Sequence, residues 1–280
     1  MTIAWGRRIG AVVVSVLLLA ATACGDGGPR TMLTGTVNIG GKSDQPGFNL
    51  HSRHSDSGFE VDLIHYLGEE LNFTPQITDV TSSHREESLK NGKNKLVIAT
   101  YSITDDRKED MDFVGPYLST SQGMLVREES KIHGLADITA EKSICTGEGS
   151  TSASAHLLPG NLQPYEQPDF STCVSDLLNK QADAVFTDKV ILYGYAQVHK
   201  SLRVVRDLSF GSANRYGIGL AKGHMNDCKA LVRALRNFLN EKWSAYFKNQ
   251  FESIVEAFPD WENRFKPSVD ELNQYSSCPV

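Results

Sequence analysis

The sequence lacks an excess of basic residues. It has 28 lysines and arginines against 34 aspartates and glutamates, which gives a formal net charge of −6. Binding to nucleic acid requires a basic stripe or patch, so this class of function is excluded. The composition also lacks the bias of a disordered chain. The 280 residues are enough for one large domain or two modest ones.

The N-terminal apolar run is too short to span a bilayer comfortably. Residues 9–23 are fifteen apolar or small residues, and they follow Arg7 and Arg8. A basic start, a short apolar segment and small residues at its end are typical of a secretory signal peptide. We therefore predict a signal peptide over 1–23 and export of the remaining chain.

The small residues immediately before Cys24 resemble a lipobox, in which the cysteine becomes the lipidated first residue of the mature chain. Ala21 departs from this pattern, which usually has leucine there. We predict lipid attachment at Cys24 and a flexible tether over 24–35, which contains the glycine-rich segment GDGGPR. The alternative is ordinary cleavage after Ala23, which leaves an unmodified cysteine.

Cysteine is scarce, with four residues besides Cys24. An even number in an exported chain indicates disulfides, and four cysteines allow three connectivities. Proximity along the chain favours Cys145–Cys173 and Cys228–Cys278. No cysteine stands at metal-ligand spacing from a histidine, and the histidines form no nucleophilic constellation. We therefore expect neither a metal site nor catalytic residues.

Strand-like and helix-like segments alternate along the chain after the tether. Strands are predicted over 36–40, 75–80, 95–103, 142–147 and 182–188, and helices over 58–73, 83–92, 151–158, 173–180, 189–197 and 228–251. This alternation predicts an α/β sheet with crossover helices. The pattern occurs twice, which indicates two similar α/β units in tandem with a terminal helix left over.

Five motifs, in this order and at this spacing, resemble the bacterial family 3 solute-binding proteins, the polar amino-acid receptors of ABC importers. They are GFEVDL (58–63), SITDDRKEDMDFVGPY (102–117), GEGSTSA (147–153), ADAVFTD (182–188) and YGIGLAKG (216–223). The resemblance covers about residues 36–255. The segment KSDQPGF (42–48) is further similar to the glutamate/glutamine branch of that family.

The resemblance implies a two-lobe, periplasmic-binding-protein-like fold of type 2, with two α/β lobes joined by two hinge strands. The hinges would fall near 120–125 and 211–217. Lobe 1 would be discontinuous, comprising 36–121 plus 216–280, and lobe 2 would comprise 122–215. The amino acid would be buried in the cleft between them, and no cofactor is implied.

A zwitterion removed from water needs an opposite charge at each end, because unpaired buried charges are costly. Arg107 matches the family's carboxylate-binding arginine, whose planar guanidinium gives two parallel hydrogen bonds. Ser102 matches a position that binds the same carboxylate. Taken alone, Arg107 lies in an acidic run and reads as a surface charge paired with Glu109 or Asp110.

The other family positions fall on three further segments. Ser150 and Thr151 match residues that hold the carboxylate from lobe 2, and they also read as a plain helix N-cap. Asp188 matches the amine-binding aspartate, with a helix-capping role as the alternative. The Thr100 carbonyl would be a second ammonium acceptor, although the family often has glycine there.

The selectivity for the side chain of the bound amino acid is inferred from single residues, which are less specific than the five motifs. Tyr101 would cover the aliphatic stem of the ligand, and Lys42 and Arg85 would meet a distal carboxylate. These two cations favour glutamate or aspartate over glutamine or asparagine, although each also reads as a surface charge.

The implied protein is a monomeric, lipid-anchored receptor on the outer face of the cytoplasmic membrane that docks on an ABC permease. One alternative is a cleft enzyme of the cyclohexadienyl dehydratase type, which needs an added general acid. No extra carboxylate or histidine stands beside the matched positions. Another alternative is an amino-acid sensor for a membrane kinase, which would use the same binding site.

Overall fold

The computed structural model describes residues 1–6, 31–52, 55–154 and 156–278. Residues 1–6 contain no helix or strand, and Thr31–Val280 form one compact unit. Cys24 and the predicted signal peptide beyond its first six residues lie outside the described residues. Among the residues that are described, no helix is both long enough and apolar enough to cross a membrane.

One side of the central sheet consists of parallel strands. β1 (Thr36–Gly41) pairs with β5 (Thr74–Asp79) and with β6 (Leu96–Val97), and α1 (Phe59–Leu71) precedes β5. Helix α1 forms because apolar residues recur at helical spacing, and this stripe is buried against the sheet. We call these three strands the β1 side of the sheet.

The other side of the sheet is built in the same way. β8 (Ile144–Gly147) pairs in parallel with β9 (Tyr165–Gln167) and with β10 (Ala184–Asp188). Helix α5 (Phe170–Leu178) follows β9, and α6 (Lys189–Val198) follows β10. We call these strands the β10 side. The predicted α/β alternation is confirmed on both sides.

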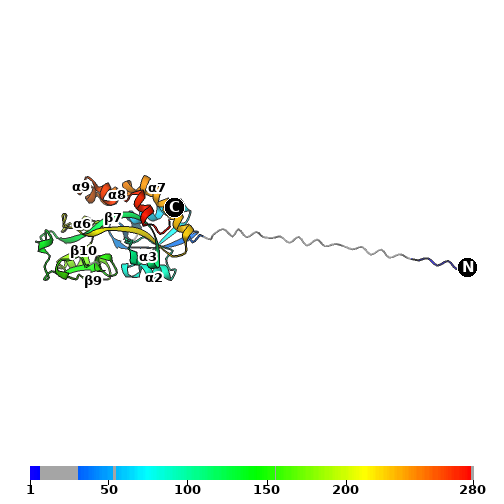
Figure 1. Ribbon diagram of the computed structural model, residues 1–280, viewed down its shortest axis with the longest axis horizontal. Coiled ribbons are helices and arrows are strands. Elements are labelled where there is room, and N and C mark those ends of the chain that lie inside the picture. The colour runs from blue at the N-terminus through cyan, green and yellow to red at the C-terminus, as the bar shows by residue number, and fades with distance from the viewer. Residues whose placement is uncertain (7–30, 53–54, 155, 279–280) are drawn as a thin grey trace. The chain divides into compact units, whose positions relative to one another are not determined.

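Two long antiparallel strands connect the two sides (Figure 1). They are β7 (Met111–Arg127) and β12 (Phe210–Ala221). The first part of β7 pairs with β12, and its second part pairs with β10. The strand order is therefore β5-β1-β6-β12-β7-β10-β8-β9 in one continuous sheet. Two strands cross between the sides as the sequence predicts, and the exact division into lobes stays a prediction.

The remaining elements are short or C-terminal. They are β2 (Asp44–Gln45), β3 (Asn49–His51), β4 (Asp56–Ser57), η1 (Ser82–His84), α2 (Arg85–Lys90), α3 (Asp105–Asp110), η2 (Leu135–Asp137), α4 (Thr151–Ser154), η3 (Pro159–Asn161), β11 (Leu202–Val204), α7 (Met225–Glu241), α8 (Trp243–Gln250), α9 (Glu252–Ala257), α10 (Trp261–Phe265) and α11 (Val269–Tyr275).

Three predicted elements are shorter or divided. The strand predicted over 95–103 is interrupted after β6, because Thr100 has a φ of 44°, and Ser102 beyond it forms an isolated bridge to Tyr216 of β12. The helix predicted over 151–158 stops after α4, since its serine-rich sequence has modest helix propensity and Pro159 restricts the residue before it. The helix predicted over 228–251 breaks at Lys242 into α7 and α8.

The break at Lys242 allows α8 to pack against the core in a different direction from α7. It allows the buried Trp243 to donate a hydrogen bond from its indole Nε1 to the Tyr117 carbonyl of β7 at 2.7 Å. Helices α7 and α8 thereby pack their aromatic residues onto the β1 side, where Phe59 of α1 contacts Phe238 and Trp243 edge to face. Such aromatic burial dominates the stability of a core.

Both predicted disulfides are present. Cys145–Cys173 joins β8 to α5, and Cys228–Cys278 joins the first turn of α7 to the C-terminal end of the described chain. Replacing Cys228 and Cys278 together with alanine is expected to lower the free energy of unfolding by about 4 kcal/mol, because the bond closes a long loop. Urea unfolding of oxidised protein and variant measures this loss. An unchanged midpoint would contradict it.

Candidate functional site

A small pocket lies among the C-terminal ends of the strands, where α/β sheets commonly bind ligands. Its lining comes from both sides of the sheet and comprises Ser82, Arg85, Thr100, Ser102, Ser150, Thr151, Phe170, Thr187, Asp188 and Ile191. The volume of this pocket is about 10 Å³, which is about enough for one water molecule. The two sides of the sheet are therefore close together here, and the pocket must widen before a metabolite can enter.

Arg85, from the start of α2, gives this pocket a buried positive charge. Its side chain is 2% exposed, and its Nη1 donates to the carbonyls of Ala99 and Thr100 at 3.0 and 3.2 Å. No carboxylate of the described residues forms an ion pair with it. Burial lowers the pKa of Arg85 to about 10, so the group stays charged at neutral pH. Carbonyl groups carry no net negative charge, so this buried cation would be stabilised by a bound anion.

Arg107 lies beside the pocket and does not line it. Its Nη1 donates to the Ser102 carbonyl at 2.8 Å, and its Nε lies 3.2 Å from Glu86 Oε1. Its Nη2 donates to the Gly149 carbonyl at 3.1 Å, and Arg85 Nη2 donates to the same carbonyl at 3.2 Å. One carbonyl from the β10 side therefore faces two guanidinium groups from the β1 side.

The predicted alternative partners of Arg107 do not pair with it. Asp110 forms an ion pair with Lys90 at 2.6 Å, whereas Glu86 of α2 pairs with Arg107. Glu86 also accepts a hydrogen bond from the Tyr101 hydroxyl at 2.7 Å. The Tyr101 ring lies under both guanidinium groups, 4.6 and 5.0 Å from their central carbons. Tyr101 thus contacts the cations and is not among the lining residues of the pocket, and its predicted contact with a ligand stem stays a prediction.

Asp188 gives the opposite charge. It ends β10, is 4% exposed, and accepts hydrogen bonds from Asn214 Nδ2 at 2.7 Å and from the Tyr216 hydroxyl at 2.6 Å. Burial raises the pKa of Asp188 to about 6, so most of it is ionised at neutral pH. Each carboxylate oxygen has a further lone pair, which leaves room for an ammonium donor.

Thr100 and Ser102 follow β6 and present backbone groups around the pocket. Thr100 is buried and has the left-handed backbone conformation that favours glycine, the residue that the family often has at this position. Its carbonyl, the predicted ammonium acceptor, accepts from Arg85. Ser102 is also buried, and it bridges to Tyr216 of β12. Both residues line the pocket, and their ligand contacts stay predictions.

Ser150 and Thr151 line the pocket from the β10 side at the start of α4. The Ser150 hydroxyl accepts from the amide of Ala153 at 3.2 Å, as in an N-cap. Thr151 Oγ1 accepts from Asn214 Nδ2 at 2.9 Å. The capping interpretation therefore holds for Ser150, while Thr151 belongs to the same hydrogen-bonded group as Asp188.

Lys42, predicted to meet a distal carboxylate, is buried but does not line the pocket. Burial, assisted by the charge of Arg85, lowers the pKa of Lys42 to about 8, and Asp44, Asp79 and Asp169 oppose that shift. It forms no ion pair within 4 Å among the described residues. Lys42 thus adds positive potential near the site from behind Arg85.

Five residues of the site were not predicted. Four line the pocket, namely Ser82, Phe170, Thr187 and Ile191, and Asn214 connects Asp188 to Thr151. Thr187 and Ile191 flank Asp188 in the sequence, so proximity to that residue was a usable signal. Phe170 and Asn214 come from segments whose motifs carry no chemistry, and only the fold brings them here.

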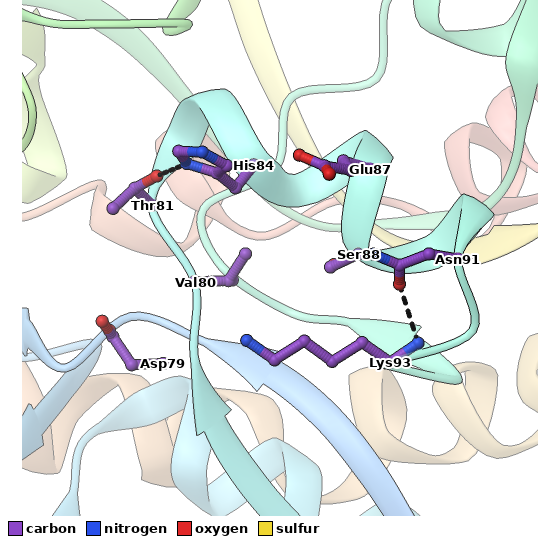
Figure 2. Close-up of a pocket in the computed structure, with 8 residues that line it drawn as sticks. All are labelled: Asp79, Val80, Thr81, His84, Glu87, Ser88, Asn91 and Lys93. Carbon is purple, nitrogen blue, oxygen red and sulfur yellow. Dashed lines mark hydrogen bonds between the residues drawn. The ribbon is translucent and has the colours of Figure 1, made fainter.

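A second, larger pocket lies on the outer side of α2 (Figure 2). It is lined by Asp79, Val80, Thr81, His84, Glu87, Ser88, Asn91 and Lys93. Five of these residues are exposed, so water already solvates their charges. Figure 2 shows His84 bonded to Thr81 and Asn91 bonded to the Lys93 amide. None of the predicted ligand-binding residues lines this pocket.

The fold is that of the substrate-binding proteins of amino-acid ABC transporters. It matches such a protein from Streptococcus pneumoniae, solved with L-arginine bound, with a TM-score of 0.71 at 19% identity, over 78% of this chain and 95% of that one. Residues 37–258 match the bacterial extracellular solute-binding proteins, family 3, and the chain belongs to that family.

Two relatives share more of the sequence. The chain is 36% identical over 250 residues to the glutamate-binding protein GluB of Corynebacterium glutamicum, covering 81% of this chain and 84% of GluB. It is 32% identical over 206 residues to a glutamine-binding protein of Geobacillus stearothermophilus, covering 71% and 77% of the two chains.

Proposed function

We propose that this chain is an extracytoplasmic receptor that binds an acidic amino acid, glutamate or aspartate, and delivers it to an ABC importer. The observation that carries the proposal is the unpaired, buried guanidinium of Arg85 in a pocket that also borders Arg107 and faces Asp188. An acidic amino acid has two carboxylates for the two guanidinium groups and an ammonium for Asp188. If the α-carboxylate of glutamine meets Arg107, which also pairs with Glu86, Arg85 remains a buried cation without a counter-charge, which is costly.

The relatives support this class of ligand. One is a glutamate-binding protein and another a glutamine-binding protein. Contacts between the two sides of the sheet support closure around the ligand, because Arg85 and Arg107 from one side share the Gly149 carbonyl of the other. A ligand carboxylate placed between them favours the closed state by contacting both sides.

We also propose that lipid attachment at Cys24 holds the receptor at the outer face of the membrane. The tether that follows Cys24 is long enough to let the folded unit reach a permease. Expression of Cys24→Ser tests the anchor: the variant is expected in the soluble extracytoplasmic fraction, whereas the parent stays with membranes. Equal membrane association of the two proteins would contradict the anchor and leave the ligand proposal intact.

A thermal-shift screen of the purified protein against the twenty amino acids tests the ligand class. Glutamate and aspartate are expected to raise the melting temperature most, because a ligand at 100 times its Kd stabilises the folded state by about 2.7 kcal/mol. Larger shifts with glutamine or asparagine would contradict the acidic preference. No shift with any amino acid would contradict the receptor function itself.

A further inference from the structure

Glu60 is a buried carboxyl group directly behind the pocket. It lies in the first turn of α1 and is 0% exposed. Its Oε1 accepts hydrogen bonds from the Thr100 amide at 2.6 Å and from the Tyr117 hydroxyl. Its second oxygen, Oε2, is buried and has no partner among the described residues. A buried polar atom without a partner is costly, so this oxygen calls for an explanation.

The contacts of Glu60 determine the shape of the pocket wall. Each polar group of Thr100 is held by a different residue: the amide by Glu60, the hydroxyl by Gln45 at 3.1 Å and the carbonyl by Arg85. Thr100 has a φ of 44°, in the left-handed region that is unfavourable for residues other than glycine. The surrounding hydrogen bonds must therefore hold it there, and the bond from Glu60 is the shortest of them.

The titratable groups that face Glu60 come from the loop after β1 and from three elements. Lys42, after β1, and Arg85, in α2, favour its ionised form, and the hydroxyls of Tyr117 in β7 and Tyr216 in β12 lie nearby. Burial outweighs these cations and raises the pKa of Glu60 to about 7. A ligand with a second carboxylate adds negative charge beside the same cations. That charge opposes the ionised form of Glu60 further.

We propose that Glu60 is a positioning residue of the ligand site, which holds Thr100 through Oε1 and takes up a proton on Oε2 when an acidic amino acid binds. The proton comes from the solvent, and the ligand enters as its monoanion. Oε1 keeps both hydrogen bonds throughout, so the pocket wall stays in place while the charge changes. This inference rests on the proposed acidic ligand.

Proton uptake is measured by calorimetric titration with glutamate at pH 7.0, in phosphate and in Tris, whose ionisation enthalpies differ. The parent protein is expected to take up a fraction of a proton with glutamate and less with glutamine. At this pH Lys42 is mostly protonated and Asp188 mostly ionised, so both contribute little to the proton uptake.

The affinity for glutamate is also expected to depend on pH. Between pH 6 and pH 8 it is expected to fall, by up to tenfold for each unit by which binding raises the pKa of Glu60.

Glu60→Gln keeps the acceptor for Thr100 and Tyr117 but does not titrate. It is expected to bind glutamate without most of this proton uptake, and its affinity is expected to fall less between pH 6 and pH 8 than that of the parent protein. Asp62→Asn is the matched control, since Asp62 lies two residues further along α1 and bonds Gln250 away from the pocket. This control is expected to keep the uptake of the parent protein.

Tyr117→Phe gives a second test that does not depend on the folding of the first variant. Loss of the Tyr117 hydroxyl removes a donor to the ionised carboxylate, so the window of proton uptake is expected to move to higher pH. Uptake that is unchanged in Glu60→Gln, or a window that stays in place in Tyr117→Phe, would overturn the inference. Failure of the parent protein to bind glutamate would instead contradict the proposed function.

Discussion

Arg107→Ala is expected to weaken glutamate binding by roughly 2–5 kcal/mol, because it strips the ligand of a charge partner at a water-poor site. Two partners fix the orientation of the guanidinium: Glu86 pairs with its Nε, and the Ser102 carbonyl accepts from its Nη1. Its Nη2 points to the Gly149 carbonyl, which a ligand carboxylate would displace. Isothermal titration calorimetry with glutamate measures the loss of affinity.

Two control variants separate this effect from general damage. Arg233→Ala removes an exposed arginine of α7 and is expected to leave affinity unchanged. Arg107→Lys keeps the charge but not the planar fork, so it is expected to recover only part of the affinity. Binding by Arg107→Ala within about twofold of the parent would contradict the assignment, and it would leave Arg85 as the main carboxylate partner.

Asp188→Asn is expected to have an effect of similar size at the other end of the ligand. The ammonium would lose the only buried carboxylate among the lining residues of the pocket, at a cost of roughly 2–5 kcal/mol. Asparagine is nearly isosteric: its one oxygen can still accept from Asn214, and its amide nitrogen can donate to the Tyr216 hydroxyl in place of the bond that Tyr216 donates to Asp188. Equilibrium binding of glutamate at neutral pH measures the loss.

The pH dependence of binding provides a further check on Asp188. The ionised form binds the ammonium, and burial raises the pKa of Asp188 to about 6. The contribution of Asp188 to the affinity is therefore expected to be retained above pH 6 and to be lost as pH decreases below it, by up to tenfold per unit. Asp188→Asn is expected to lose this acidic limb. If the limb persists in the variant, another group titrates and the role of Asp188 is contradicted.

Much of the fold follows from the sequence, because periodicity and strand–helix alternation are local signals. Helix α1 was predicted from its apolar stripe and β10 from a buried strand before Asp188. The motifs also brought Ser102, Ser150 and Asp188 to one pocket across 86 residues of chain. Their placement there is observed, while their binding roles stay predictions.

The rest of the site depends on long-range contacts that no local signal encodes. Glu86 pairs with Arg107 from another helix, whereas the sequence favoured the neighbouring Glu109 or Asp110. In the sequence, Glu60 has the pattern of an ordinary acidic residue in the first turn of a helix, where the helix dipole stabilises a negative charge. Only the fold shows that it is buried against Thr100. Thr100 departs from the strand conformation because the side chains of Glu60 and Arg85 hold its backbone amide and carbonyl, and Gln45 accepts from its hydroxyl.

The crossing of β7 and β12 has a mechanical consequence. Phe210 pairs with Gln122 and Asn214 with Thr120, so three residues of β12 face one residue of β7 at this point. Bending there breaks no ladder bonds, while the strands on either side remain paired. The sheet is therefore continuous across both sides but has few ladder bonds at this one place, where a change in the angle between the two sides would disturb the pairing least.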